Sequence, residues 1–134
     1  MNLELESGPK IDNPTPEQVS KSLQTLDGAG NSFVILAKDQ MNYVQASGGP
    51  ESGFSVEYQT GSIEEHFGTT RLDLPLATVD SIFRAYAAND PRWTEATTWA
   101  HQELKSASQA RFPFIPSALA AGMFLVYLWW KNAA

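Results

Sequence analysis

The segment GFSVEYQT, residues 53–60, alternates between apolar and polar side chains, and no other feature of the chain constrains the fold as strongly. The apolar residues of the alternation are Phe54, Val56 and Tyr58, and the polar residues are Ser55, Glu57 and Gln59. A period of two residues is typical of a strand in an antiparallel sheet, with one face in the core and the other in water. The segment therefore predicts a sheet that is buried on one side.

Two more strand-like segments precede this one, and turn signals separate them. Residues 33–37 form an unbroken apolar run that is too short for a helix and rich in residues that favour strands, and we expect it to be the central strand. Residues 41–47 form the next candidate strand, which residues 48–50, Gly-Gly-Pro, bring to an end. The three segments together predict an antiparallel sheet.

Residues 61–62, Gly-Ser, have the composition of a two-residue hairpin loop. Pairing outward from this loop places Val56 opposite Phe67 on the core side and Glu57 opposite His66 on the wet side. The residues that this register assigns to the wet face are Glu57, Gln59, Glu64 and His66.

Two helices flank the strands. Thr15 suits the N-cap of the first helix, Pro16 suits its first position, and Gln18 completes a capping box. Its apolar stripe consists of Val19, Leu23 and Leu26. Pro75 fits the first turn of the second helix, which ends at residues 89–91. Its apolar stripe consists of Leu76, Val79, Ile82, Phe83 and Tyr86.

These elements predict an α+β fold: an antiparallel sheet of three to five strands with two helices packed on one face, plus a C-terminal hydrophobic helix. The segment that holds Trp93 and Trp99, which we expect to be buried, could be a strand or a short helix. The chain divides into a loosely ordered start (1–12), an acidic α+β domain (13–104), a basic linker (105–111) and a hydrophobic tail (112–130).

The tail contains nineteen uncharged residues between Arg111 and Lys131. A continuous helix of that length would span roughly 28 Å, close to the hydrocarbon thickness of a bilayer. A start at Pro116 would shorten it to roughly 22 Å. The tail could span a membrane, lie in its interface or dock on the body, and we favour the membrane because Ser117 is its only polar side chain. The residues that define it are Phe114, Leu119, Phe124, Leu125, Tyr127, Trp129, Trp130 and Lys131.

Charge is distributed unevenly along the chain. Fifteen acidic and nine basic residues give a formal net charge of -6. Residues 1–104 hold all fifteen acids and six of the bases, a net charge of -9, whereas residues 105–134 hold three bases and no acid. Nucleic acid is an unsuitable partner for such a surface, because phosphate binding needs a basic footprint. A basic protein is the expected charged partner.

The sequence offers little for catalysis or metal binding. Without cysteine it has no thiolate ligand and no cysteine nucleophile. Glu64, Glu65 and His66 are consecutive, but on a strand only Glu64 and His66 would point to the same side, too few ligands for zinc. We therefore expect no enzyme activity, no catalytic residue, no cofactor and no metal site, and we interpret Glu57 and His66 as a cross-strand pair.

Three segments of the chain carry a family resemblance: NPTPEQVSKSLQTLDGAGNSFVIL, YVQASGGPESGFSVEYQTG and FRAYAANDPRW, the last followed by Trp99. In this order they resemble Imm1-type immunity proteins of bacterial polymorphic toxin systems. The resemblance implies a non-enzymatic inhibitor that binds a cognate toxin domain, often one that acts on nucleic acid, and shields the producing cell. It covers about residues 13–99, and the hydrophobic tail is not part of it.

Residues 39–70 hold five acids and no base, a field that would attract the basic groove of a nuclease or deaminase. The candidate partner-binding residues are Glu51, Glu57, Gln59, Glu64, Glu65 and His66. The start of the chain shows no secretion signal, so we expect a cytoplasmic body that the tail could anchor to the inner membrane. The alternative function is a tail-anchored adaptor or scaffold whose soluble domain recruits another protein, and the oligomeric state is open.

Overall fold

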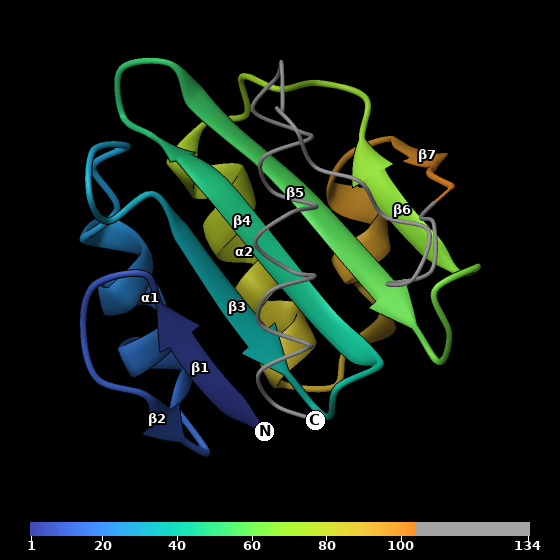
Figure 1. Cartoon of the computed structure of the whole chain (residues 1–134), viewed down its shortest axis with the longest axis horizontal. Helices are drawn as coiled ribbons and strands as arrows, with labels where there is room; N and C mark the ends of the chain where they lie inside the picture. The colour runs from blue at the N-terminus through green and yellow to red at the C-terminus, as the bar shows by residue number, and fades with distance from the viewer. Residues whose placement is uncertain (104–134) are drawn as a thin grey trace, which may run out of the picture.

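Antiparallel strands form one sheet in the computed structural model, which describes residues 1–103 (Figure 1). The order across this part of the chain is β2-β1-β3-β4-β5-β6-β7. The strands are β1 (Asn2–Leu5), β2 (Ile11–Asp12), β3 (Phe33–Ala37), β4 (Asn42–Gly49), β5 (Gly53–Thr60), β6 (His66–Thr69) and β7 (Trp99–His101). The α+β class is confirmed, with seven strands within residues 1–103 in place of the expected three to five, and β4 lies at the centre where β3 was expected.

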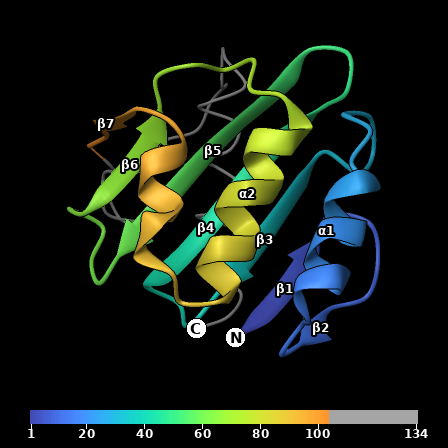
Figure 2. The ribbon, with the colours of Figure 1, turned by 180° about the vertical axis from the view of Figure 1, so that it is seen from behind.

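Three helical segments of the described part of the chain cover one side of the sheet (Figure 2). They are α1 (Pro16–Gln24), α2 (Leu76–Ala87) and the 3-10 helix η1 (Pro91–Ala96). The predicted capping box starts α1: Thr15 Oγ1 accepts a hydrogen bond from the Gln18 N–H at 3.1 Å, and Gln18 Oε1 accepts one from the Thr15 N–H at 2.8 Å. The packing of both α-helices on one face is as predicted.

The main hydrophobic core lies between these helices and the sheet. Alternate residues of the strands point into it, as their period of two requires. The largest contributors are Leu23 of α1, Phe54 of β5, and Ile82 and Phe83 of α2, all at most 2% exposed. We call this side of the sheet the helix face and the opposite side the second face.

The segment that holds Trp93 and Trp99, for which the sequence allowed a strand or a short helix, contains one of each. Trp93 lies in η1 and Trp99 begins β7, and each ring meets the ring of Tyr58 edge to face with centroids 4.7 Å apart. Both tryptophans pack against the main core, which agrees with the expected role in burial. The Trp99 indole N–H also donates a hydrogen bond to the carbonyl oxygen of Thr94 at 2.9 Å.

The start of the chain differs from the prediction. Residues 1–12 were expected to be loosely ordered, yet β1 pairs with β3 along its whole length and β2 extends the sheet beyond β1. Leu3 is 1% exposed and belongs to the main core. A four-residue strand is too short to stand out in the sequence, and its stability comes from tertiary contacts, chiefly the pairing with β3 and the burial of Leu3.

The hairpin between β5 and β6 also differs. Its connection comprises residues 61–65 instead of the two-residue loop, and Thr60 N–H donates to the Glu65 carbonyl oxygen at 3.0 Å. His66 consequently lies opposite Gln59, and Phe67 opposite Tyr58. This register is two residues away from the predicted one, so the side chains that remain on the strands keep their predicted faces, whereas Glu64 lies in the connection.

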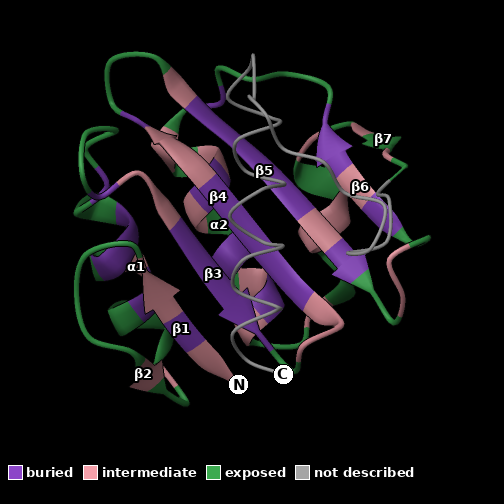
Figure 3. Ribbon diagram, viewed as in Figure 1, coloured by how far each residue is buried: buried purple, intermediate pink, exposed green. Residues whose placement is uncertain are grey.

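The second face is buried as well, contrary to the predicted wet surface (Figure 3). Each of its central side chains is at most 4% exposed, and they are Ile35, Ala37, Tyr43, Gln45, Ser55, Glu57, Gln59 and His66. The predicted linker (105–111) and hydrophobic tail (112–130) lie outside the described residues.

Candidate functional site

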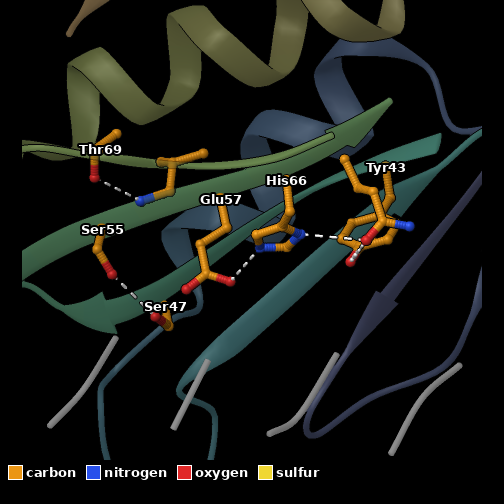
Figure 4. A network of polar contacts seen from close by, with 8 residues as sticks. Tyr43, Ser47, Ser55, Glu57, His66 and Thr69 are labelled. Carbon is orange, nitrogen blue, oxygen red and sulfur yellow. Dashed lines mark hydrogen bonds and ion pairs between the residues drawn. The ribbon is translucent and has the colours of Figure 1, made fainter. Parts of the chain in front are cut away.

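Four polar side chains form a continuous set of contacts on the second face, and we call Tyr43, Glu57, Gln59 and His66 the polar network (Figure 4). His66 Nε2 lies 3.2 Å from Glu57 Oε2, and His66 Nδ1 lies 3.3 Å from Gln59 Oε1. The Tyr43 hydroxyl donates to the same Gln59 oxygen at 3.2 Å. The network runs from β6 across β5 to β4, and the predicted contact between Glu57 and His66 is confirmed.

The hydrogen-bond chemistry of the polar network sets its protonation. Gln59 Oε1 can only accept, so His66 Nδ1 carries a hydrogen. The contact between His66 Nε2 and Glu57 then needs one further proton, which either partner can carry. Both arrangements leave the pair without net charge, which is the form that a buried site accommodates at least cost.

Burial shifts the acid–base behaviour of the polar network. The pKa of Glu57 is raised because its carboxylate is removed from water, and the hydrogen bond and charge of His66 oppose that shift. The pKa of Tyr43 is raised well above its ordinary value, chiefly by burial and further by the charge of Glu57. Tyr43 therefore stays a neutral hydrogen-bond donor at physiological pH.

More polar side chains continue this pattern across β4 and β5. Ser47 Oγ and Ser55 Oγ lie 3.2 Å apart (Figure 4). Gln45 lies opposite Glu57 in the strand register. Tyr43 is the network member that the candidate list from the sequence missed. The parity that joins it to Gln45 and Ser47 along the strand was the available signal.

Burial divides the six predicted partner-binding residues into two groups. Glu57, Gln59 and His66 are at most 3% exposed and contact one another, so they do not form the accessible acidic face that we expected. Glu51, Glu64 and Glu65 are exposed, and they lie in loops rather than on a strand. The prediction assumed that the polar side of the strand faces water. It was wrong because the exposure of a sheet face depends on what packs over it.

The exposed acids occupy opposite ends of the sheet. Glu51 lies in the turn between β4 and β5, whereas Glu64 and Glu65 lie in the connection between β5 and β6. That connection lies beside the turn between β3 and β4, because the Gly61 N–H donates to the Met41 carbonyl oxygen at 3.0 Å. The turn contributes Asp39, and we call Asp39, Glu64 and Glu65 the acidic end.

Asp39 is held as a carboxylate. Its oxygens accept hydrogen bonds from the Asn42 side chain at 3.0 Å and from the Met41 N–H at 2.8 Å. These bonds, that of Asn42 first, lower the pKa of Asp39. Within residues 1–103, no member of the acidic end forms a salt bridge, although Lys38 neighbours Asp39 in sequence with its Nζ 4.8 Å from the centre of the Tyr86 ring.

The described residues offer no group of three or more histidine and carboxylate side chains that could hold a metal ion. Glu64 lies in the loop and is exposed, whereas His66 lies on β6 and is buried, so even these two do not converge. An open groove of about 440 Å³ lies between α1 and α2. Its lining includes Ser20 and Arg84, which are joined by a hydrogen bond of 3.0 Å.

No helix within residues 1–103 has the length and apolar character needed to cross a membrane. The chain matches no known protein-family model, and comparisons with curated proteins and with solved structures found no significant match. The acidic end and the polar network are therefore the candidate functional features of the described residues.

Proposed function

We propose that this protein is a non-enzymatic immunity protein that binds and neutralises a cognate bacterial toxin domain with a basic, nucleic-acid-binding surface. The observation that carries the proposal is the acidic end: three exposed carboxylates in two adjacent loops, with no salt-bridge partner within residues 1–103. The resemblance of residues 13–99 to Imm1-type immunity proteins supports the same function.

The acidic end suits a basic partner for an electrostatic reason. Carboxylates that lack a partner of their own leave a negative potential in the solvent, which speeds the encounter with a positive surface. A toxin that acts on nucleic acid needs a positive groove to bind phosphates. The carboxylates of the acidic end would occupy part of that groove and exclude the substrate.

The position of the acidic end also fits a binding role. Its loops project from the ends of β3, β4, β5 and β6, which form the middle of the sheet. Loops held by a rigid scaffold are frequent sites of recognition. The contact therefore shifts from the sheet face, where we first placed it, to the loops at one end of the sheet.

Co-expression tests the proposed function. The full chain would be produced in cells that also express a toxin-like domain identified from a neighbouring gene, and growth would be compared with cells that express that domain alone. We expect the chain to restore growth and to form a one-to-one complex with the purified domain. Growth arrest in the presence of folded, abundant chain would contradict the proposal.

The same experiment separates the alternative function, a tail-anchored adaptor or scaffold. An adaptor would recruit a partner without changing the toxicity of any neighbouring gene product. Its distinguishing feature is the hydrophobic tail (112–130), whose proposed helix and membrane association rest on the sequence alone. Restored growth favours the immunity protein whether or not the tail reaches a membrane.

A further inference from the structure

The second face of the sheet is buried, although no helix of the described residues packs on it. Its central side chains are at most 4% exposed, although α1, α2 and η1 all lie on the helix face (Figures 1 and 2). An antiparallel sheet with one uncovered face exposes the side chains of that face to water. The burial of the second face therefore requires a covering layer from outside residues 1–103.

We infer that the hydrophobic tail of the same chain, residues 112–130, docks on the second face and covers it. The inference concerns an intramolecular contact and does not depend on the proposed function. It chooses docking on the body from the three positions that the sequence left open for the tail.

The direction of the chain at the end of the described part supports this occupant. After β7 the Gln102 N–H donates to the His66 carbonyl oxygen at 2.8 Å, so the chain still lies beside β6. The Gln102 side chain occupies the space directly over Gly68, where a Cβ would collide with it. Gly68 and His66 share a face of β6, so the Gln102 side chain lies on the second face, and the chain leaves the described part at the edge of that face.

The dimensions agree as well. Strands β3 to β6 make a surface about 14 Å wide, and an eight-residue strand is about 26 Å long. A helix made of the tail residues after Pro116 would measure about 22 Å, which matches the length of β4 and β5. The residues between Glu103 and the tail reach up to about 28 Å when extended, enough to place the tail anywhere on this surface.

The chemistry of the second face accepts an apolar cover. Ile35, Ala37 and Tyr43 form a small hydrophobic cluster there. The polar network pairs its groups with one another, so an apolar layer could cover it without breaking hydrogen bonds. The tail has Ser117 as its only polar side chain and could supply that layer.

Cysteine accessibility in the full chain tests the inference, because the natural sequence has no cysteine. Ser55→Cys reports on the second face, where Ser55 is 4% exposed. Ser81→Cys is the exposed reference on α2, and Ser22→Cys is the buried reference on the helix face. Each variant would be treated with a water-soluble maleimide, with and without the tail substitutions Phe124→Asp and Leu125→Asp.

We expect Ser55→Cys to react at least about tenfold more slowly than Ser81→Cys, because reaction requires local opening. The tail substitutions should raise its rate to near that of Ser81→Cys while Ser22→Cys stays protected, which shows that the fold has survived. Rapid reaction of Ser55→Cys with the natural tail would overturn the inference, as would protection that the tail substitutions leave intact. Protection that disappears on dilution would identify a second copy of the chain as the cover, and protection that appears only with phosphatidylglycerol vesicles would identify a membrane. Either result would also overturn the inference.

Discussion

His66 Nε2 and Glu57 Oε2 lie 3.2 Å apart with both side chains shielded from water, and one proton between them keeps the pair without net charge. The two residues are not directly opposite in the register, since His66 faces Gln59 and Glu57 faces Gly68. The imidazole therefore reaches the carboxyl group diagonally across β5 and β6, and the contact depends on the register of these strands.

Stability should depend on pH through this pair. The pKa of folded Glu57 is raised above its ordinary value of 4.5 by burial, so its contribution is fully present below that pH and is lost as pH rises through the folded pKa. Glu57→Gln replaces the acid by a neutral side chain of similar shape. As pH rises from 4.5, the free energy of unfolding of the natural protein should fall relative to that of the variant.

Urea unfolding of both proteins over this pH range provides the measurement. The acids whose pKa is lowered, such as Asp39 and Asp90, titrate in both proteins and cancel in the difference. A difference that stays constant with pH would show that burial does not govern the ionisation of Glu57.

Charge reversal at the acidic end should slow association with the proposed toxin partner. Glu64→Lys together with Glu65→Lys is expected to lower the association rate constant by about tenfold at low salt and to weaken its salt dependence. Glu51→Lys is a control that reverses an exposed acid about 25 Å away along β5. Stopped-flow or surface-binding kinetics would measure both, and equal effects at the two ends would remove the acidic end from the binding mechanism.

Alanine substitutions at Gly53 and Gly61 should distinguish the cost of backbone strain from the cost of a steric collision. Gly53 and Gly61 have φ of +84° and +86°, but an added Cβ at Gly53 would lie 2.7 Å from the backbone of Asp73, whereas at Gly61 it would meet nothing within 4 Å. Gly61→Ala should cost about 1 kcal/mol for the backbone conformation alone. Gly53→Ala should cost roughly 2 kcal/mol more, because β5 and the segment before α2 must move apart.

Thermal or urea unfolding of the two alanine variants would measure the comparison. Equal losses of stability would mean that Asp73 yields without cost and that the close approach does not matter.

Tyr58 should act through its ring rather than its hydroxyl. The ring stacks on Phe67 with centroids 4.9 Å apart and meets Trp93 and Trp99 edge to face. Tyr58→Ala should therefore reduce the free energy of unfolding by about 2–3 kcal/mol, while Tyr58→Phe should change it by less than about 0.5 kcal/mol. Chemical unfolding followed by tryptophan fluorescence reads both, since Trp93 and Trp99 contact the ring. A stable Tyr58→Ala variant that had lost toxin binding would instead make Tyr58 a partner anchor.

Sequence reasoning predicted the local elements well where the physics is local. The capping box at Thr15 and Gln18 and the apolar stripe of α2 involve residues within one or two turns of each other. The parity of β5 was also correct, since alternation is a property of the strand itself. The short strand β1 was missed because its stability comes from pairing with β3, about thirty residues away.

The candidate site was predicted only in part. The sequence placed Glu57, Gln59 and His66 together on one face, and a register error of two residues did not disturb that placement. It could not reveal that this face is buried, because strand periodicity describes how side chains alternate and carries no information about the layer above them. Tyr43 joins the polar network through strand pairing, which a list of separate motifs does not show.

The amino-acid sequence by itself determined where the helices start, which strand residues share a face, and that the body carries an excess of acid. Tertiary structure alone decided which of those faces water reaches, which acids stay exposed, and that the loops of Asp39 and Glu64 meet at one end of the sheet. The physical reason is range: caps and alternation arise between near neighbours in the chain, whereas burial and loop proximity arise from segments that only the folded sheet brings together.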